Sequence, residues 1–369
     1  MRREIIQLLM IVAALLCIGS LMVFSVGSVR PGGDSLFKHH VAAVLIGAFC
    51  MFVASHMDYH FYKGHQFFRT FALVTLTLLV YVLVLGEEVR GARRWVRILT
   101  FQFQPSELAK VAVIMILALK MSENREHIRS FFRGFVPSVA IACFFAGLIV
   151  LEPDLGVPLV IMATAFAMMF VAGVRTRYLV GSIAPVGLAV AGLIKMYPYR
   201  VERFFAFLDP YKFRDGVGFH LIQSLAAFAR GAVWGLGPGA GQQKLSYLPD
   251  AHTDFIFAVL GEELGLVGTL VVVVLFVLLL RSILRIAQRA PDRFGALLAS
   301  GIAALIGFQA ALNIAVTIGL LPTKGLPLPF VSYGGTATVV FMGLAGILVN
   351  IGLQAEQPAQ KLAPMYAQG

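Results

Sequence analysis

The residues with the clearest chemical potential lie in one stretch, QQKLSYLPDAHTDFIFAVLGEELGLVG, residues 242–268. The stretch begins polar, passes through His252 and Asp254, and then runs into a long apolar segment. Asp254 therefore stands where a polar loop meets a predicted membrane span, and a carboxylate is expensive to keep there, which makes it a candidate functional residue. The alternative is a helix cap, because Thr253 or Asp254 could cap a helix that starts near Phe255. The spacing fits both roles.

Basic side chains gather in the loops that share a membrane side with Asp254. Four arginines occupy the short segment GEEVRGARRWVRI, and six Lys and Arg residues occupy the long loop of residues 197–254. One explanation is contact with anionic lipid headgroups. The other is an anionic substrate such as a lipid phosphate or diphosphate, because Arg makes bidentate, charge-assisted contacts with phosphate. These residues are Arg90, Arg93, Arg94, Arg97, Arg200, Arg203, Lys212, Arg214, Arg230 and Lys244.

Two pairs of charged residues lie in or next to predicted spans. Glu107 and Lys110 are three residues apart in PSELAKVAV, on one face of a helix. Each alone would cost ~3 kcal/mol near the bilayer centre, so we expect a structural ion pair near the outer membrane boundary, with a wall of a substrate cavity as the alternative. Glu152 and Asp154 in LEPDLG lie at the outer join of two spans, where the neighbouring Pro and Gly also fit an ordinary turn.

The last outer loop, GLLPTKGLPLPFVSYGGT (residues 319–336), holds three prolines followed by two glycines. Broken backbone near membrane depth is tolerated only where it is buried in protein or lines a cavity, so this loop and the Asp254 junction could line one cavity. The segment GLGPGAGQQK, residues 235–244, lacks the strand and the GK[ST] ending of a phosphate loop. His56 and His60 have the spacing of a helical metal pair, but no third ligand is near them in sequence. We therefore predict no protein-bound metal.

The composition indicates the class of protein. Of the 369 residues, 59% are hydrophobic and 13% are charged, with a mean hydropathy of +0.85, which is too little charge for the surface of a soluble protein. The apolar runs are long and continuous, which excludes a transmembrane β-barrel and predicts an all-α polytopic membrane protein. The net charge of +11 is scattered over the loops, so we expect no nucleic-acid partner. Cys17, Cys50 and Cys143 lie inside apolar runs and predict neither a disulfide nor a metal site.

Runs of about 17–25 apolar residues predict ten membrane spans. The short loops carry fifteen Lys and Arg residues on one side and seven on the other, which places both termini in the cytoplasm and Asp254 outside. We predict one membrane domain, residues 1–353, with a large outer loop at 197–254, and a disordered cytoplasmic tail at 354–369. Within the loop, residues 221–235 have apolar side chains at helical spacing and predict a helix along the membrane surface. The predicted spans are residues 5–26, 40–57, 69–86, 105–120, 135–151, 157–174, 178–196, 255–280, 296–320 and 333–353.

Together these motifs resemble one family. The segments GARRWVRI, FQPSELAK, EPDLG, YRVERFFAFLDP, GQQKLSYLPDAHTDFIFAVLGEELGLVG and LPTKGLPLPFVSYGGT are similar, in order and over nearly the whole chain, to the SEDS proteins (shape, elongation, division and sporulation). These are membrane-embedded peptidoglycan polymerases and include FtsW, RodA and SpoVE. The LPTKG loop and the run from LIQSLAAFARG to HTDFIF look closer to the division branch, FtsW, than to the elongation branch, RodA.

The resemblance implies an inverting glycosyl transfer on the outer face of the membrane. A growing glycan on undecaprenyl pyrophosphate would be the donor, and the GlcNAc 4-hydroxyl of lipid II would attack it. Asp254 matches the family's catalytic aspartate, which implies a general base, and a divalent cation, Mg²⁺ or Mn²⁺, could help to neutralise the pyrophosphates. The candidates for pyrophosphate binding are Arg94, Lys244, Arg203 and Arg200, in that order. Further candidate contacts are His252, Ser332 and Tyr333, and the structural or cavity-lining polar residues are Glu107, Lys110 and Glu152.

The same resemblance implies partners and a location. The chain would work in the bacterial cytoplasmic membrane with a class B penicillin-binding protein as the transpeptidase, and with other membrane proteins of the divisome or elongasome. The alternatives are an elongation-type polymerase, a lipid II flippase or a non-catalytic divisome scaffold. A flippase would carry charged groups at several depths along its path, whereas here they gather at the outer face. A scaffold predicts that replacing Asp254 costs only about 1 kcal/mol of capping energy.

Overall fold

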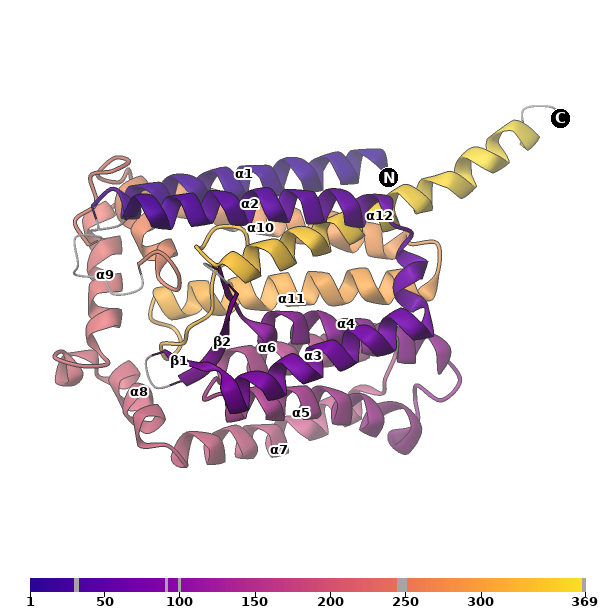
Figure 1. Cartoon of the computed structure of the whole chain (residues 1–369), viewed down its shortest axis with the longest axis horizontal. Helices are drawn as coiled ribbons and strands as arrows, with labels where there is room; N and C mark the ends of the chain where they lie inside the picture. The colour runs from indigo at the N-terminus through magenta and orange to yellow at the C-terminus, as the bar shows by residue number, and fades with distance from the viewer. Residues whose placement is uncertain (30–32, 90–91, 99–100, 244–250, 367–369) are drawn as a thin grey trace.

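The structure, a computed structural model, describes residues 1–29, 33–89, 92–98, 101–243 and 251–366. In this part the chain forms a bundle of ten long helices, with a small sheet at one end and shorter helices at both ends (Figure 1). Each long helix coincides with one predicted span, so the all-α polytopic fold is confirmed. The ten are α1 (Arg2–Gly27), α2 (Gly33–His56), α3 (His65–Leu85), α4 (Pro105–Glu123), α5 (Val136–Leu151), α6 (Gly156–Ala172), α7 (Thr176–Lys195), α10 (Ile256–Gln288), α11 (Arg293–Thr317) and α12 (Gly335–Tyr366).

Among the described residues, eight helices are long and apolar enough to cross a membrane by length and composition alone. The other two predicted spans differ for separate reasons. α6 is apolar but only 17 residues long, and α4 carries Glu107, Lys110 and Lys120. Most of α4 is buried, and it packs against α3, α5, α6 and α11. Glu107 and Lys110 are buried against protein rather than lipid, which is where a membrane protein tolerates charges.

The two termini lie at the same end of the bundle, as an even number of spans requires (Figure 1). The last helix, α12, continues past residue 353 and stays helical to Tyr366, beyond the bundle. The structure thus differs from the disordered tail predicted from residue 354. Ala355 and Glu356 are strong helix formers, so the helix of the bundle propagates through them.

Helix α10 is broken, although residues 255–280 were predicted as one continuous span. Gly265 has φ 67° and ψ −165°, and it separates a half-helix that starts at Ile256 from the long half that ends at Gln288. A Cβ at position 265 would lie 2.4 Å from the Gly235 backbone nitrogen. Both the positive φ and this close approach require glycine. The break in α10 therefore depends on glycine at position 265, and it lies at the end of the bundle that holds Asp254.

Neighbouring backbone satisfies the polar groups that the break exposes. The amides of Leu236 and Gly237 donate to the carbonyls of Glu262 and Glu263, each at 3.0 Å. In return, the amides of residues 266 and 267 donate to the carbonyls of residues 232 and 233, at 2.9 and 3.2 Å. Irregular backbone at membrane depth needs such protein partners. The segment of residues 232–237 is thereby fixed to α10.

The sheet and the helices between α7 and α10 lie at the end of the bundle that holds Asp254 (Figure 1). A three-stranded antiparallel sheet forms where the sequence analysis predicted only a basic loop, and it pairs Glu88 with Arg93 and Arg97 with Gln102. A helix is present there as α9, which packs mainly against α10, and its Ser224 donates to the Thr317 carbonyl at the end of α11 at 2.7 Å. The elements at this end are β1 (Glu87–Val89), β2 (Ala92–Ile98), β3 (Phe101–Phe103), α8 (Pro198–Leu208), α9 (Phe219–Gly231) and the short helix Pro210–Phe213. The short helices Tyr59–Lys63 and Phe131–Phe135 lie at the opposite end, between α2 and α3 and between α4 and α5.

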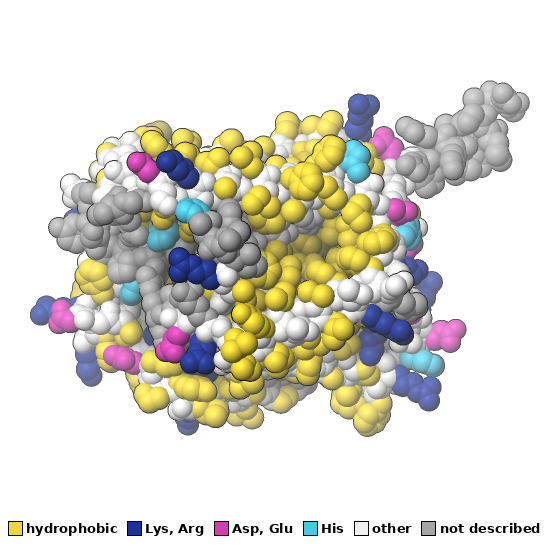
Figure 2. Space-filling model, in the orientation of Figure 1, with side chains coloured by type: hydrophobic (Ala, Val, Ile, Leu, Met, Phe, Trp, Pro, Cys, Tyr) yellow, Lys and Arg dark blue, Asp and Glu magenta, His cyan; other side chains and the backbone are white. Residues whose placement is uncertain are grey.

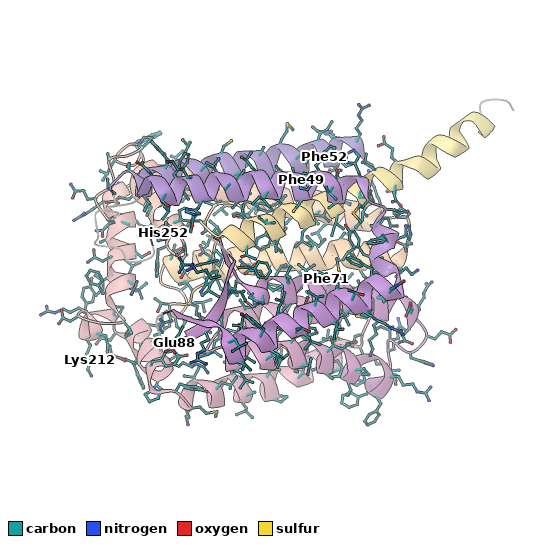
Figure 3. The ribbon with its side chains drawn as sticks, in the orientation of Figure 1. Phe49, Phe52, Phe71, Glu88, Lys212 and His252 are labelled. Atoms are coloured by element: carbon teal, nitrogen blue, oxygen red, sulfur yellow. The ribbon has the colours of Figure 1, made fainter. Side chains whose placement is uncertain are left out.

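One face of the bundle is hollowed between α2 and α3, and hydrophobic side chains line the hollow (Figure 2). Both helices are poorly buried. Phe49 and Phe52 on α2 are 67% and 61% exposed, and Phe71 lies on α3 across this face (Figure 3). Lys and Arg side chains lie on the same face toward the end that carries α8 and α9 (Figure 2). An apolar groove therefore runs toward the polar end of the molecule.

Candidate active site

Asp254 lies directly before α10, and its carboxylate faces the last outer loop. A Cβ built on Gly325 would be 3.1 Å from Asp254 Oδ2, so the carboxylate lies against the Lys324–Gly325 backbone. The N-cap of α10 is Phe255, one residue after Asp254. Asp254 thus stands outside the N-cap position, next to a loop that the sequence analysis predicted to share its cavity.

Asn313 on α11 holds these two segments together. Its Nδ2 donates to the Asp254 carbonyl at 2.8 Å and to the Leu326 carbonyl at 2.6 Å. Asn313 is buried, and a buried amide that bridges two backbone carbonyls fixes their separation. The position of Asp254 relative to the 324–326 backbone is therefore set by a side chain of the bundle.

Three of the predicted contact residues lie in this junction. The Tyr333 amide donates to the His252 carbonyl at 2.9 Å, and the two rings are 5.5 Å apart. The Ser332 hydroxyl donates to the Thr253 carbonyl and accepts from the Leu328 amide. The buried Ser332 hydroxyl therefore links the segment before α10 to the last outer loop. His252 lies at the same end of the bundle as Glu88 of the sheet, whereas Lys212 points away from it (Figure 3).

Arg94 of β2 reaches the turn between α5 and α6. Its Nε donates to the Glu152 carbonyl at 2.9 Å, its Nη2 donates to the Pro153 carbonyl, and its Nη1 lies 3.9 Å from Asp154 Oδ2. Asp154 in turn accepts the Gly156 amide at 2.7 Å at the start of α6. The LEPDLG segment is thus a turn. It also fixes the position of Arg94, the first of the predicted pyrophosphate ligands.

Glu152 is buried beside this arginine. Burial first, and then the negative charge of Asp154, raise the pKa of Glu152 to about 8, against a smaller opposing effect of Arg94. Among the described residues neither oxygen of its carboxyl group has a hydrogen-bond partner. Near neutral pH most of this group is protonated, so it adds little negative charge to a basic cluster.

Lys324 joins this cluster to Asp254, and the sequence analysis did not select it. Burial lowers the pKa of Lys324 to about 8, Asp154 raises it, and Arg200 and Arg203 lower it. Those causes place Lys324 among Asp154 and the two arginines of α8. A Cβ built on the next residue, Gly325, would lie 3.1 Å from the Asp254 carboxylate. In sequence, Lys324 is one outer-loop charge among several. Only the folded loop shows where it lies.

The two arginines of α8 differ in burial and in the contacts that their side chains make within the protein. Arg200 is 5% exposed; its guanidinium lies 4.3 Å from the Tyr197 ring and donates to the Leu193 carbonyl at 3.0 Å. Arg203 is exposed on the same helix. Of this pair, Arg203 offers the more accessible charge to a ligand. Lys244, the second predicted pyrophosphate ligand, lies outside the described residues.

The predicted ion pair in α4 is present and lies inside the bundle. Lys110 Nζ is 2.8 Å from Glu107 and 2.7 Å from Gln309 Oε1, and both charged side chains are buried. Gln309 Nε2 donates to the Pro327 carbonyl at 2.9 Å. The pair thus lies in the interior of the bundle, and Gln309 links it to the loop that faces Asp254.

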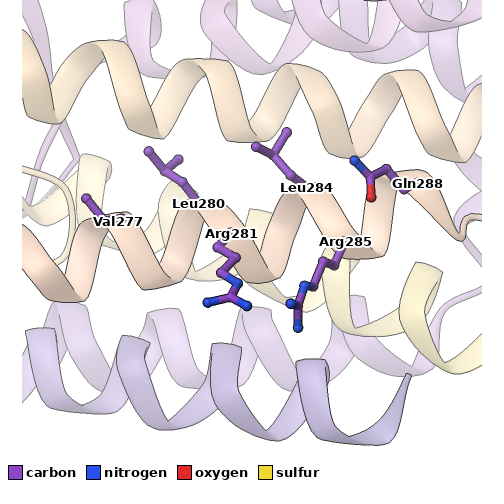
Figure 4. Close-up of a pocket in the computed structure, with 6 residues that line it drawn as sticks. All are labelled: Val277, Leu280, Arg281, Leu284, Arg285 and Gln288. Atoms are coloured by element: carbon purple, nitrogen blue, oxygen red, sulfur yellow. The ribbon is translucent and has the colours of Figure 1, made fainter.

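A separate groove lies on the long half of α10, away from Asp254 (Figure 4). Its volume is about 460 Å³, and mainly apolar side chains line it beside Arg281 and Arg285. Arg285 is already paired with Glu4 at 2.7 Å. This groove contains no group suited to glycosyl transfer.

The fold and the site together define a polytopic membrane protein with a carboxylate and several basic groups at one end. The chain matches the family described as "Cell cycle protein" (FtsW, RodA and SpoVE) over residues 6–357. It is 41% identical to "Probable peptidoglycan glycosyltransferase FtsW" of Geobacter sp. (strain M18), covering 93% of this chain and 95% of that one. It is 39% identical, with the same coverage, to "Stage V sporulation protein E" of Bacillus subtilis (strain 168). The chain belongs to the FtsW/RodA/SpoVE family.

Solved structures agree with this assignment. One, described as "Structural coordination of polymerization and crosslinking by a peptidoglycan synthase complex", superposes with a TM-score of 0.79 at 30% identity, covering 95% of this chain and 98% of that one. Rod shape determining protein RodA of Thermus thermophilus superposes with a TM-score of 0.69 at 27% identity, covering 95% and 96%. The family resemblance stated from the sequence is confirmed.

Proposed function

We propose that this chain is a peptidoglycan glycosyltransferase of the division type. It would transfer the growing glycan from undecaprenyl pyrophosphate to the GlcNAc 4-hydroxyl of lipid II, during septal wall synthesis. The relatives named FtsW support the activity and the branch. The observation that carries the chemistry is the Asp254 carboxylate, which lies against the backbone of Gly325, the residue that follows Lys324.

In the proposed reaction Asp254 accepts the proton of the lipid II 4-hydroxyl as the new bond forms to the anomeric carbon of the donor. The bond between that carbon and the pyrophosphate oxygen breaks, and undecaprenyl pyrophosphate leaves with the electron pair. Lys324, Arg203 and Arg94 would stabilise the charge that develops on the leaving group. Attack opposite the leaving group inverts the anomeric centre.

Both substrates carry long lipid chains, so the site must be reached from the membrane. The apolar hollow between α2 and α3 runs toward the basic end of the bundle, which supports entry of a lipid chain from the side (Figure 2). The proposal keeps both termini in the cytoplasm and the site outside, on the charge asymmetry of the loops. The chain would lie in the bacterial cytoplasmic membrane.

The proposal includes a class B penicillin-binding protein as partner. A solved peptidoglycan synthase complex superposes on this chain, which supports such an association. Among the described residues no group of three His, Cys, Asp or Glu side chains could hold a metal ion. We therefore derive no step through a divalent cation, and the involvement of Mg²⁺ or Mn²⁺ stays a prediction.

The test is polymerisation of labelled lipid II by the purified protein with its partner. Asp254→Asn should lower the rate by ~10²–10⁴-fold, the usual contribution of a general base, while folding and partner binding stay intact. The matched control is Asp215→Asn, an exposed carboxylate of the same outer loop, which should be neutral. Normal polymerisation by Asp254→Asn would refute the general-base assignment. Absence of polymer from the native chain, with lipid II crossing vesicle membranes, would favour a flippase instead.

A further inference from the structure

Two connections between helices, α4 to α5 and α6 to α7, carry exposed arginines at the end of the bundle opposite the candidate active site (Figure 1). In the described part of the chain, no carboxylate lies within 4.0 Å of any of these arginines. The same connections hold only two carboxylates, Glu123 and Glu126. Together the arginines form a patch with excess positive charge. They are Arg125, Arg129, Arg133, Arg175 and Arg177.

Aromatic rings hold the two connections against each other. The Tyr178 ring, at the start of α7, lies 5.1 Å from the Phe131 ring and 5.8 Å from the Phe135 ring. Those two phenylalanines belong to the short helix before α5, and their rings stack 5.6 Å apart. In sequence, Arg133 lies between the two phenylalanines, and Arg177 precedes the tyrosine. Arginines of both connections therefore adjoin one aromatic cluster.

The guanidinium group of Arg177 is held in place by this cluster. Its Nη2 donates to the Tyr178 hydroxyl at 2.9 Å, and its carbon lies 4.9 Å from the centroid of the same ring. A guanidinium that is already ordered loses less freedom when it binds an anion. Arg175 is the N-cap residue of α7, and the first turn of that helix has no acidic residue. The helix dipole opposes positive charge at this position, so a bound anion would stabilise the arrangement.

The lengths of the helices place the patch at the depth of lipid headgroups. Phe131–Leu151 and Thr176–Lys195 are both long and apolar enough to cross a membrane. The first stretch has 21 residues, and at 1.5 Å per residue it spans about 31 Å, the thickness of the hydrocarbon core. Arg133 and Arg177 lie in the first turns of these stretches, where lipid phosphates are found. Phe132 is 78% exposed, so an apolar side chain stands next to Arg133 at the membrane boundary.

We propose that the patch binds an anionic phospholipid, with Arg133, Arg175 and Arg177 on the headgroup phosphate and Phe132 on the acyl chain. Arginine makes bidentate, charge-assisted contacts with phosphate. An anionic lipid also neutralises the excess positive charge of the patch, which a zwitterionic lipid does not. In the proposed topology this lipid lies in the cytoplasmic leaflet, on the opposite side from the glycosyl transfer, and the site does not depend on that reaction.

The test measures lipid binding to the purified protein in detergent by native mass spectrometry. Phosphatidylglycerol is the anionic probe and phosphatidylcholine the zwitterionic one, and the native chain should bind phosphatidylglycerol more tightly. Each Lys or Arg near a membrane surface contributes about fivefold in affinity for anionic lipid. Arg133→Gln with Arg177→Gln should therefore weaken phosphatidylglycerol binding about 25-fold. Arg133→Lys with Arg177→Lys keeps both charges and should recover most of that loss.

The matched control is Arg2→Gln with Arg3→Gln. Both residues are exposed on α1 at the same end of the bundle, and the double variant removes the same net charge as the variant of the patch. The control should bind phosphatidylglycerol as the native chain does. Without added lipid, both double variants should melt at the native temperature, because all four side chains are exposed.

Equal binding of the two lipids by the native chain would overturn the site. An equal loss of binding in the control and in the variant of the patch would overturn it too, since the effect would then follow net charge alone. Inorganic phosphate is the third probe: phosphatidylglycerol should raise the melting temperature, and inorganic phosphate at the same concentration should not. Equal stabilisation by both would make the ligand a free anion rather than a lipid. Because no step measures polymerisation, failure of this site leaves the proposed function standing, and the reverse also holds.

Discussion

If Asp254 is the general base that we propose, Gly325→Ala should slow polymerisation through a small displacement of its carboxylate. The new Cβ would be 3.1 Å from Asp254 Oδ2, about 0.3 Å inside the 3.4 Å at which ordinary contact begins. A misplacement of about 1 Å can cost ~10²-fold in rate. If the free-energy cost is proportional to the displacement, about 0.3 Å corresponds to a roughly fourfold loss of kcat, or about 0.8 kcal/mol.

The assay is single-round polymerisation of labelled lipid II with the partner at saturating concentration. Gly335→Ala is the matched control, because no atom lies within 4 Å of a Cβ at that position, and it should retain the native rate. Both variants should melt at the native temperature, since the crowded neighbour is the far end of a side chain. A native kcat in Gly325→Ala, while Asp254→Asn is inactive, would refute the idea that the carboxylate works from the position seen here.

Two further predictions concern charge. Burial and the neighbouring arginines lower the pKa of Lys324 to about 8, so its positive charge is present below pH 8 and lost above it. KM for lipid II should therefore rise between pH 7 and 9, and Lys324→Arg should remove that rise. The same pH profile in Lys324→Arg and the native protein would contradict the role of Lys324 in binding the pyrophosphate. Lys110→Met leaves Glu107 buried without its cation and should cost about 3–5 kcal/mol of unfolding free energy. Glu107→Leu with Lys110→Met should recover most of that loss in thermal unfolding in detergent, and equal instability of the single and double variants would contradict the buried-pair argument.

The spans and the seam at Asp254 could be predicted because each depends on local sequence. An apolar run of membrane length has few alternatives to a helix, and α4 follows the same pattern despite its four charged residues. The Glu107–Lys110 pair was also predictable, since residues three apart on a helix meet. Asp254 stood out because a carboxylate beside an apolar run is unusual.

The break in α10 could not be predicted in the same way. Residues 255–280 have an uninterrupted helical pattern, and Gly265 alone is tolerated within many membrane helices. What breaks the helix is the distant segment 232–237, whose amides and carbonyls pair with those of α10. Lys324 was missed for the same reason: its neighbours Asp154 and Arg200 come from other parts of the chain.

Helix α11 explains how a membrane bundle can hold this site rigidly. Gln309, Asn313 and Thr317 are spaced four residues apart, so they form one buried polar stripe. From one end of the stripe to the other, Gln309 binds the Pro327 carbonyl, Asn313 binds the carbonyls of Asp254 and Leu326, and the Thr317 carbonyl accepts Ser224 of α9.

Together the members of the stripe fix three elements at this end of the bundle to the same helix. The last outer loop, the Asp254 junction and α9 share one reference frame, although long stretches of sequence separate them. Hydrogen bonds from buried amides to backbone carbonyls suit this purpose because they constrain position without adding charge. The ionisable groups of the site can therefore stay available for substrate, while neutral side chains of α11 hold the backbone that carries them.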